Sequence, residues 1–177
     1  KTKKRVSTVP YRIPEKKNTT VVSSYTHSVS IGTQPVLIGE RINPTGKPKL
    51  KQALKENNIS YILNEAVRQT DKGVHILDVN AGLPEINEAE VMFECIKAIQ
   101  TVTDVPLQID SSDPQVLDKA MRVYNGKALI NSVNGKKESM DSILPLVKKY
   151  GGCVIALTID ENGIPDTARG RADIAAK

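Results

Sequence analysis

Acidic and amide side chains gather at the ends of five apolar runs in this chain. Each run ends in, or is followed within a few residues by, such groups: Glu40 and Asn43, Asp78 and Asn80, Asp110, Asn131 and Asn134, and Asp160. A carboxylate accepts two parallel N–H bonds, and an amide both donates and accepts. Because a carboxylate is costly to bury without partners, these positions need a physical explanation.

Two explanations compete for these side chains. Asp, Asn and Ser are good helix N-caps and turn formers, which accounts well for Asp113 and Asn134. Capping explains Asp78 and Asp110 poorly, because both still lie in the apolar runs, several residues before the next helical pattern. We therefore assign Asp78, Asp110 and Asn131 to a site for a ligand that supplies hydrogen-bond donors.

The remaining residue types narrow the chemistry of that site. The only histidines are His27 and His75, and His75 lies in the apolar run VHIL, which indicates a structural core or interface residue. No glycine-rich phosphate loop is present, and a divalent metal held by Asp78, Asp110 and Glu40 is a weak case without histidine. Carboxylates mixed with amides suit a flat, neutral ring rich in N–H donors, such as a pterin or a purine.

Strand and helix patterns alternate along the chain and would position these groups. The apolar runs predict strands, and the intervening segments carry helical periodicity. Strands are expected at 35–39, 74–80, 105–110, 127–133 and 153–160, and helices at 48–72, 87–102, 114–124 and 137–150, with a further helix beginning at 169. Continuous apolar strands are typical of parallel sheets covered by helices. In such sheets the carboxyl ends of the strands form one surface, where ligands bind.

Two architectures fit five such units. One is a complete five-stranded doubly wound sheet, and the other is the first five βα units of a (β/α)₈ barrel. The chain stops at Lys177 inside a helical pattern, which favours a truncated barrel over residues 35–177.

The charge of the chain is concentrated at its start. The net charge is +5, but residues 1–17 hold seven Lys or Arg and one Glu, so the remainder is close to neutral. We interpret residues 1–34 as a basic, Ser/Thr-rich interdomain linker with one short strand near 20–25, in preference to a nucleic-acid-binding tail. No apolar run approaches the roughly 18 residues of a membrane span. Cys95 and Cys153 lie in apolar contexts, which fits free thiols in a reducing cytoplasm.

Several motifs resemble the folate-binding domain of cobalamin-dependent methionine synthase and, less closely, the methyltetrahydrofolate–corrinoid protein methyltransferases. They are IGERINPTGK, LDVNAG, LQIDSSD, INSVNGK and LTIDENGIP, in the family's order over residues 36–177. The segment before them is similar to the linker that follows the homocysteine-binding domain. The resemblance implies a (β/α)₈ barrel of the dihydropteroate-synthase type that presents the N5-methyl of 5-methyltetrahydrofolate to cob(I)alamin.

The resemblance also implies roles for particular residues. Asp110 and Asn131 match contacts to the pterin ring, with Asp110 left unpaired for the ligand. Asp78 and Asn80 match polar residues on the floor of the site. Asn43 and Lys47, in the segment NPTGK, match the first loop, near the ligand or its glutamate tail.

The implied partners lie outside this sequence. They are a homocysteine-binding domain, which would carry zinc, a cobalamin-binding domain and the remainder of the barrel, whose strands six and seven supply the other pterin contacts. No residue of this sequence is an obvious acid for N5 of the folate. A dihydropteroate-synthase-like enzyme fits less well, because the Ser-Thr-Arg-Pro-Gly run is absent. A non-catalytic ligand-binding or interaction module is the alternative of another class.

Overall fold

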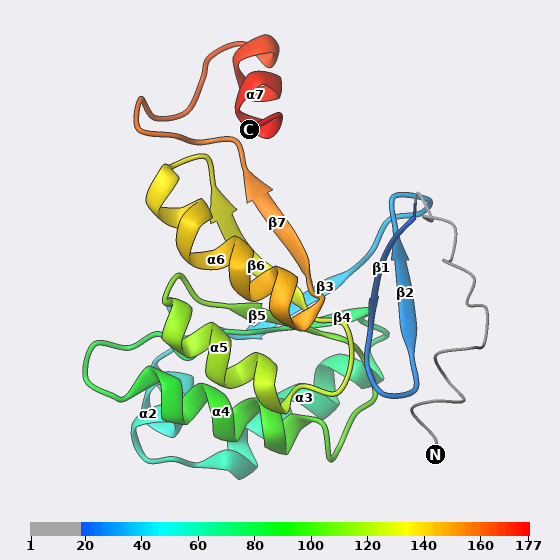
Figure 1. The fold of residues 1–177 in the computed structure, drawn as a ribbon. Helices are drawn as coiled ribbons and strands as arrows, with labels where there is room; N and C mark the ends of the chain where they lie inside the picture. Colours follow the sequence, from blue (N-terminus) through cyan, green and yellow to red (C-terminus); the bar gives the residue numbers. More distant parts are fainter. Residues whose placement is uncertain (1–18) are drawn as a thin grey trace, which may run out of the picture.

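Five parallel strands form one sheet in the computed structural model of this chain, which describes residues 19–177 (Figure 1). Their order in the sheet is the order of the chain: β3 (Ile38–Ile42), β4 (Ile76–Val79), β5 (Leu107–Asp110), β6 (Leu129–Asn134) and β7 (Cys153–Leu157). A doubly wound sheet would reverse its strand order after an early strand. The consecutive order therefore confirms the first five βα units of a (β/α)₈ barrel.

Helices follow each strand of this sheet; α2 to α6 cover one side of it, and α7 lies beyond the end of β7 (Figure 1). They are α2 (Pro48–Lys55), α3 (Ile59–Asp71), α4 (Glu88–Ile99), α5 (Pro114–Val123), α6 (Lys137–Tyr150) and α7 (Ala168–Ala175). The prediction of one helix over 48–72 was wrong, because the helical conformation is interrupted between α2 and α3. There Asn57 adopts a positive φ of 55°, and the Asn58 side chain caps α3 by accepting from the Tyr61 N–H at 3.1 Å. Asparagine tolerates both roles, so two adjacent asparagines end one helix and start the next.

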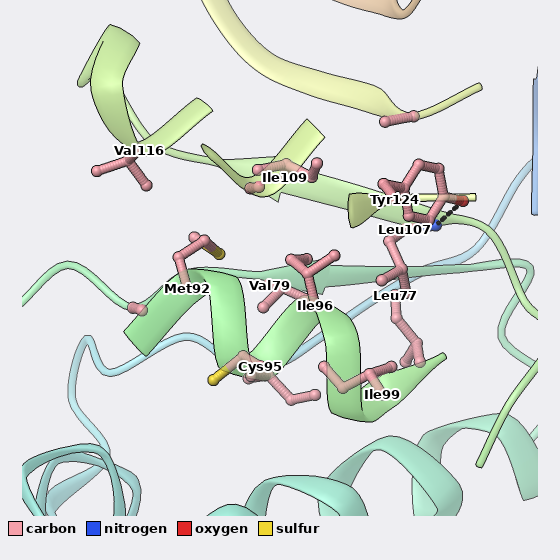
Figure 2. Packing of buried hydrophobic residues seen from close by; sticks show 14 of the residues in the cluster. Leu77, Val79, Met92, Cys95, Ile96, Ile99, Leu107, Ile109, Val116 and Tyr124 are labelled. Carbon is pink, nitrogen blue, oxygen red and sulfur yellow. Dashed lines mark hydrogen bonds between the residues drawn. The ribbon is translucent and has the colours of Figure 1, made fainter. Parts of the chain in front are cut away.

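Alternation along the strands divides their side chains between two faces. Leu77 and Val79 of β4, with Leu107 and Ile109 of β5, face the helices and are fully buried among α4 residues such as Ile96 (Figure 2). The intervening residues, including Asp78, Gln108 and Asp110, therefore face the concave side that would become the barrel interior. The polar groups predicted for the site lie on this side because the apolar residues that alternate with them pack against the helices.

A hairpin of β1 (Thr20–Ser23) and β2 (Ser28–Ile31) covers the concave side at the amino-terminal ends of the strands, which is its lower end. Val22 and Val29 pack there against Ile76 and Leu129, near the starts of the barrel strands. The sequence predicts a single strand here, within a linker over residues 1–34, of which residues 1–18 lie outside the described part. Four-residue strands with only alternate residues buried give a weak pattern, which is why the second strand was missed.

Some local expectations changed in the structure. His75 is exposed and accepts the Leu37 N–H through Nδ1 at 2.8 Å, so the expectation of a core histidine was wrong, and the alternative of an interface histidine stays a prediction. Cys95 is buried, which raises the pKa of its thiol to about 12, and Cys153 is half-buried. No helix within residues 19–177 has the length and hydrophobicity needed to cross a bilayer.

Tyr124 anchors the hairpin to the barrel through its hydroxyl. The hydroxyl donates to the Ser23 carbonyl at 2.8 Å and accepts the Leu107 N–H at 3.0 Å, the second of which is drawn in Figure 2. Tyr124→Phe leaves the buried Leu107 N–H without this partner, whereas the half-buried Ser23 carbonyl still accepts the Lys127 N–H. We expect a loss of about 1–3 kcal/mol in the free energy of unfolding, measured by urea denaturation.

Tyr150→Phe is the matched control for this prediction. The Tyr150 hydroxyl donates to Asp118 at 2.8 Å in a half-buried place, where water can replace it. The loss there should stay near or below about 1 kcal/mol, because exposed polar contacts contribute little. Equal losses for the two variants would contradict an anchoring role for Tyr124.

The two outer strands of the five-stranded sheet, β3 and β7, each have one neighbour in the described structure. Open edges of this kind present unpaired main-chain groups that favour association. We expect the 177-residue polypeptide to associate with rising concentration in sedimentation equilibrium. Leu157→Lys, which places a charge at a 40% exposed position on β7, should reduce association. A stable monomer at high concentration would count against this.

Candidate pterin-binding site

The strand register brings polar residues together in two layers, a lower layer of Asp78 and Gln108 and an upper layer of Asp110 and Asn131. Asp78 of β4 lies opposite Gln108 of β5. One step further along, Asp110 of β5 lies opposite Asn131 of β6. Because each step of two residues returns to the same face, both layers line the concave side near the carboxyl ends of the strands.

The lower layer is fully enclosed. The Gln108 Nε2 group donates to Oδ1 of Asp78. Asp78 is 1% exposed and Gln108 is 6% exposed. Within residues 19–177, Asp78 Oδ2 and Gln108 Oε1 are both buried without a hydrogen-bond partner. Two adjacent acceptors without donors are costly in a folded protein, so this layer requires an explanation.

The upper layer is open to ligands. Asn80, just beyond β4, donates through Nδ2 to Oδ2 of Asp110 at 2.9 Å, and its own Oδ1 accepts the Gly82 N–H at 2.8 Å. Asp110 and Asn131 are half-buried. The expectation that Asp110 stays unpaired was therefore wrong for one of its two oxygens. The Asn80 amide holds the carboxylate in place, and the other oxygen accepts no hydrogen bond within the described residues.

Burial changes the acidity of both aspartates. It raises the pKa of Asp78 to about 7, with the nearby carboxylates of Asp110 and Glu40 adding to the rise and the bond from Gln108 opposing it. Burial also raises the pKa of Asp110, opposed by the bond from Asn80 and assisted by Glu40. The deeper aspartate therefore holds its proton more strongly.

The first loop is held in shape by Asn43 and Lys47. Asn43 is buried, donates through Nδ2 to Glu40 at 3.2 Å, and accepts the Thr45 N–H at 3.0 Å. The Lys47 ammonium donates to the Asn43 main-chain carbonyl at 2.9 Å. Both predicted residues thus lie at the first strand end, where they fix the loop that borders the upper layer.

Neighbouring polar residues serve the local structure. Asp113 caps α5, since its Oδ1 accepts the Gln115 N–H at 2.8 Å. Asn134 closes a turn by accepting the Lys136 N–H at 3.0 Å. Asp160 bonds Lys177 at 2.8 Å beyond β7. A cavity of about 340 Å³, lined in part by Ser112, Ser132 and Asn134, lies beside these turns.

Gln108 was missed by the sequence analysis, although a signal was present. The runs LDVN and LQID each place two polar residues two positions apart, so that both point to the same face of a strand. In the described part of the chain, no group of three or more His, Cys, Asp or Glu side chains is arranged to hold a metal ion.

Comparisons with known proteins identify the family of the chain. Residues 39–176 match the family described as pterin binding enzyme. The chain is 33% identical over 142 residues to the methylcorrinoid:tetrahydrofolate methyltransferase of Eubacterium limosum, covering 78% of this chain and 52% of that protein. It is 29% identical over 163 residues to the methionine synthase of Mycobacterium leprae, covering 88% of this chain and 14% of that protein. The chain thus spans about half of the first relative and a small part of the second.

Solved structures share the fold. The DHPS of Yersinia pestis with a pterine–sulfa conjugate superposes with a TM-score of 0.57 at 19% identity, over 79% of this chain and 50% of that one. The 7,8-dihydropteroate synthase of Vibrio fischeri gives a TM-score of 0.55 at 20% identity, over 77% and 48%. Identity at this level supports the fold alone. With the family match over residues 39–176, the chain belongs to the pterin-binding enzymes.

Proposed function

We propose that this chain binds 5-methyltetrahydrofolate and positions its N5-methyl group for transfer to cob(I)alamin, as part of methionine synthesis from homocysteine. The observation that carries the proposal is the upper layer. There, one oxygen of Asp110 is fixed by Asn80, and the carboxylate lies in register with Asn131 on a half-buried surface. This set accepts N–H bonds and also offers an amide, which suits the edge of a pterin ring.

Each residue of the site has a different role in the proposed binding of folate. Asp110 accepts ring N–H groups, and Asn131 both gives and accepts beside it. Asn80 keeps the Asp110 carboxylate oriented before the ligand arrives, so less ordering is lost on binding. Asn43 and Lys47 shape the first loop along the ligand, and Asp78 lies on the floor beneath.

The proposed reaction depends mainly on positioning. The N5–methyl bond would break with its electron pair left on N5, which a proton must neutralise, and bound cob(I)alamin would supply the nucleophile for the methyl group. A fixed ring orientation lowers the barrier by aligning the methyl group with the nucleophile. The cobalamin-binding and zinc-carrying homocysteine-binding domains are proposed partners, with the polypeptide that completes the barrel.

The similarity to the Eubacterium limosum enzyme favours a second candidate. That protein is named for transfer between a methylcorrinoid and tetrahydrofolate, and its matched region is more similar to this chain than the matched methionine synthase region. In this candidate the same folate site serves a separate corrinoid protein. The two functions differ in the final methyl acceptor. Methyl transfer from 5-methyltetrahydrofolate to homocysteine, assayed with and without added corrinoid protein, separates them.

Asp110→Asn tests the folate site. The substitution keeps the shape of the side chain but replaces a charged acceptor with a donor that faces the donors of the ring. Loss of a charge-assisted hydrogen bond costs roughly 1.5–3 kcal/mol, or about tenfold to a hundredfold in affinity. We expect this loss in a titration of the purified protein with 5-methyltetrahydrofolate.

Asp113→Ala is the control. It removes the cap of α5, so stability should fall by about 1 kcal/mol while folate affinity stays within a few-fold of the parent. If Asp110→Asn lowers stability but leaves the affinity unchanged, Asp110 has no role in binding the pterin.

A further inference from the structure

Two amide-to-carboxylate bonds cross between β4 and β5 in opposite directions. In the lower layer the amide of Gln108 on β5 donates to Asp78 on β4. In the upper layer the amide of Asn80 after β4 donates to Asp110 on β5. The two carboxyl groups thus lie diagonally on adjacent strands, one enclosed and one open to ligands.

The enclosed carboxyl group lacks donors that a charged form would need. Its Oδ2 atom is buried and accepts no hydrogen bond within residues 19–177, and the same is true of Gln108 Oε1. Because both atoms are inaccessible, a folate ring bound above cannot supply the missing donors. An ionised carboxylate in this place would retain a large desolvation cost.

The groups that face Asp78 are mostly acidic. Glu40 on β3 and Asp110 on β5 are the nearby carboxylates, and the amide of Asn43 from the first loop opposes their effect. The Lys47 ammonium, the cation of that loop, bonds the Asn43 main-chain carbonyl. The negative charges of these two neighbouring carboxylates favour a proton on the enclosed Asp78 carboxyl group. The pKa of Asp78, raised to about 7 chiefly by burial, agrees with this geometry.

We propose that at pH 6 Asp78 is a neutral carboxylic acid in the folded protein, and that with Gln108 it then forms an uncharged floor that leaves Asp110 as the charged acceptor for the ligand. The proton on the Asp78 carboxyl group comes from solvent. With the Gln108 amide turned over, Oε1 accepts the Asp78 hydroxyl, so the same pair is bonded in either protonation state. Asp78 and Gln108 are then positioning residues. Their effect on the ligand rests on the proposed function, whereas the protonation of Asp78 does not.

The first test needs no ligand. In a ¹³C NMR titration of the protein labelled at Asp carboxyl carbons, one buried resonance should still be protonated at pH 6 and should titrate near pH 7. It should disappear in Asp78→Asn. If that variant does not fold, Gln108→Glu should displace the same resonance. If the resonances show that every aspartate carboxyl group is ionised at pH 6, the proposal is overturned.

Stability gives a second measure with a defined sign. The pKa of Asp78 is higher in the folded protein than its ordinary value of 3.8, so its contribution to stability falls as the pH rises from about 4 to about 7. The urea midpoint of Asp78→Asn should therefore rise relative to the parent across that range, because the amide does not ionise. Midpoints that stay parallel across the range would contradict the proposal.

The effect on the ligand is tested by measuring the affinity at pH 6. At pH 6 Asp78 is already neutral, so Asp78→Asn should bind 5-methyltetrahydrofolate within about threefold of the parent, whereas Asp110→Asn should lose about tenfold or more. Gln108→Glu places a second carboxyl group in the floor. The pH below which folate affinity falls should then be higher than in the parent. A tenfold loss at pH 6 in Asp78→Asn would show that a charged Asp78 is needed. If the parent binds no folate, the proposed function fails while the NMR result still decides the state of Asp78.

Discussion

The pairing of β4 with β5 is the constraint on which the site depends. Its register places Asp78 opposite Gln108 and brings Asn80 within 2.9 Å of Asp110. A shift of one residue would turn these polar groups toward the helices and would turn Leu77 and Ile109 toward the concave side. The apolar contacts with α4 therefore fix the position of the ligand-binding groups, and stability and function share one register.

Most of the fold could be predicted because the strands are strongly apolar and the breaks between elements carry clear signals. Asp113 before Pro114, for example, marked the start of α5 correctly. The hairpin was only half predicted, since its strands bury few residues and gain their order from distant contacts with Ile76 and Tyr124. Such contacts have no local trace in the sequence.

For the site, residue types indicated the chemistry, but geometry was needed for the partners. The strand-end positions of Asp110 and Asn131 followed from the alternation of elements. The bond from Asn80 to Asp110 and the enclosure of Gln108 did not, because both depend on the exact offset between two strands. Pattern analysis gives strand ends within a few residues, whereas a hydrogen bond requires an offset correct to one residue.

The hairpin that covers the lower end of the concave side has a consequence for the order of events. With Val22 and Val29 packed below Ile76 and Leu129, a ligand at Asp110 is reached from the carboxyl ends of the strands. In the proposed reaction the corrinoid must approach the methyl group from that same end. Folate would then have to enter before the corrinoid arrives and could depart only after it withdraws, so the shared entrance imposes a sequential mechanism.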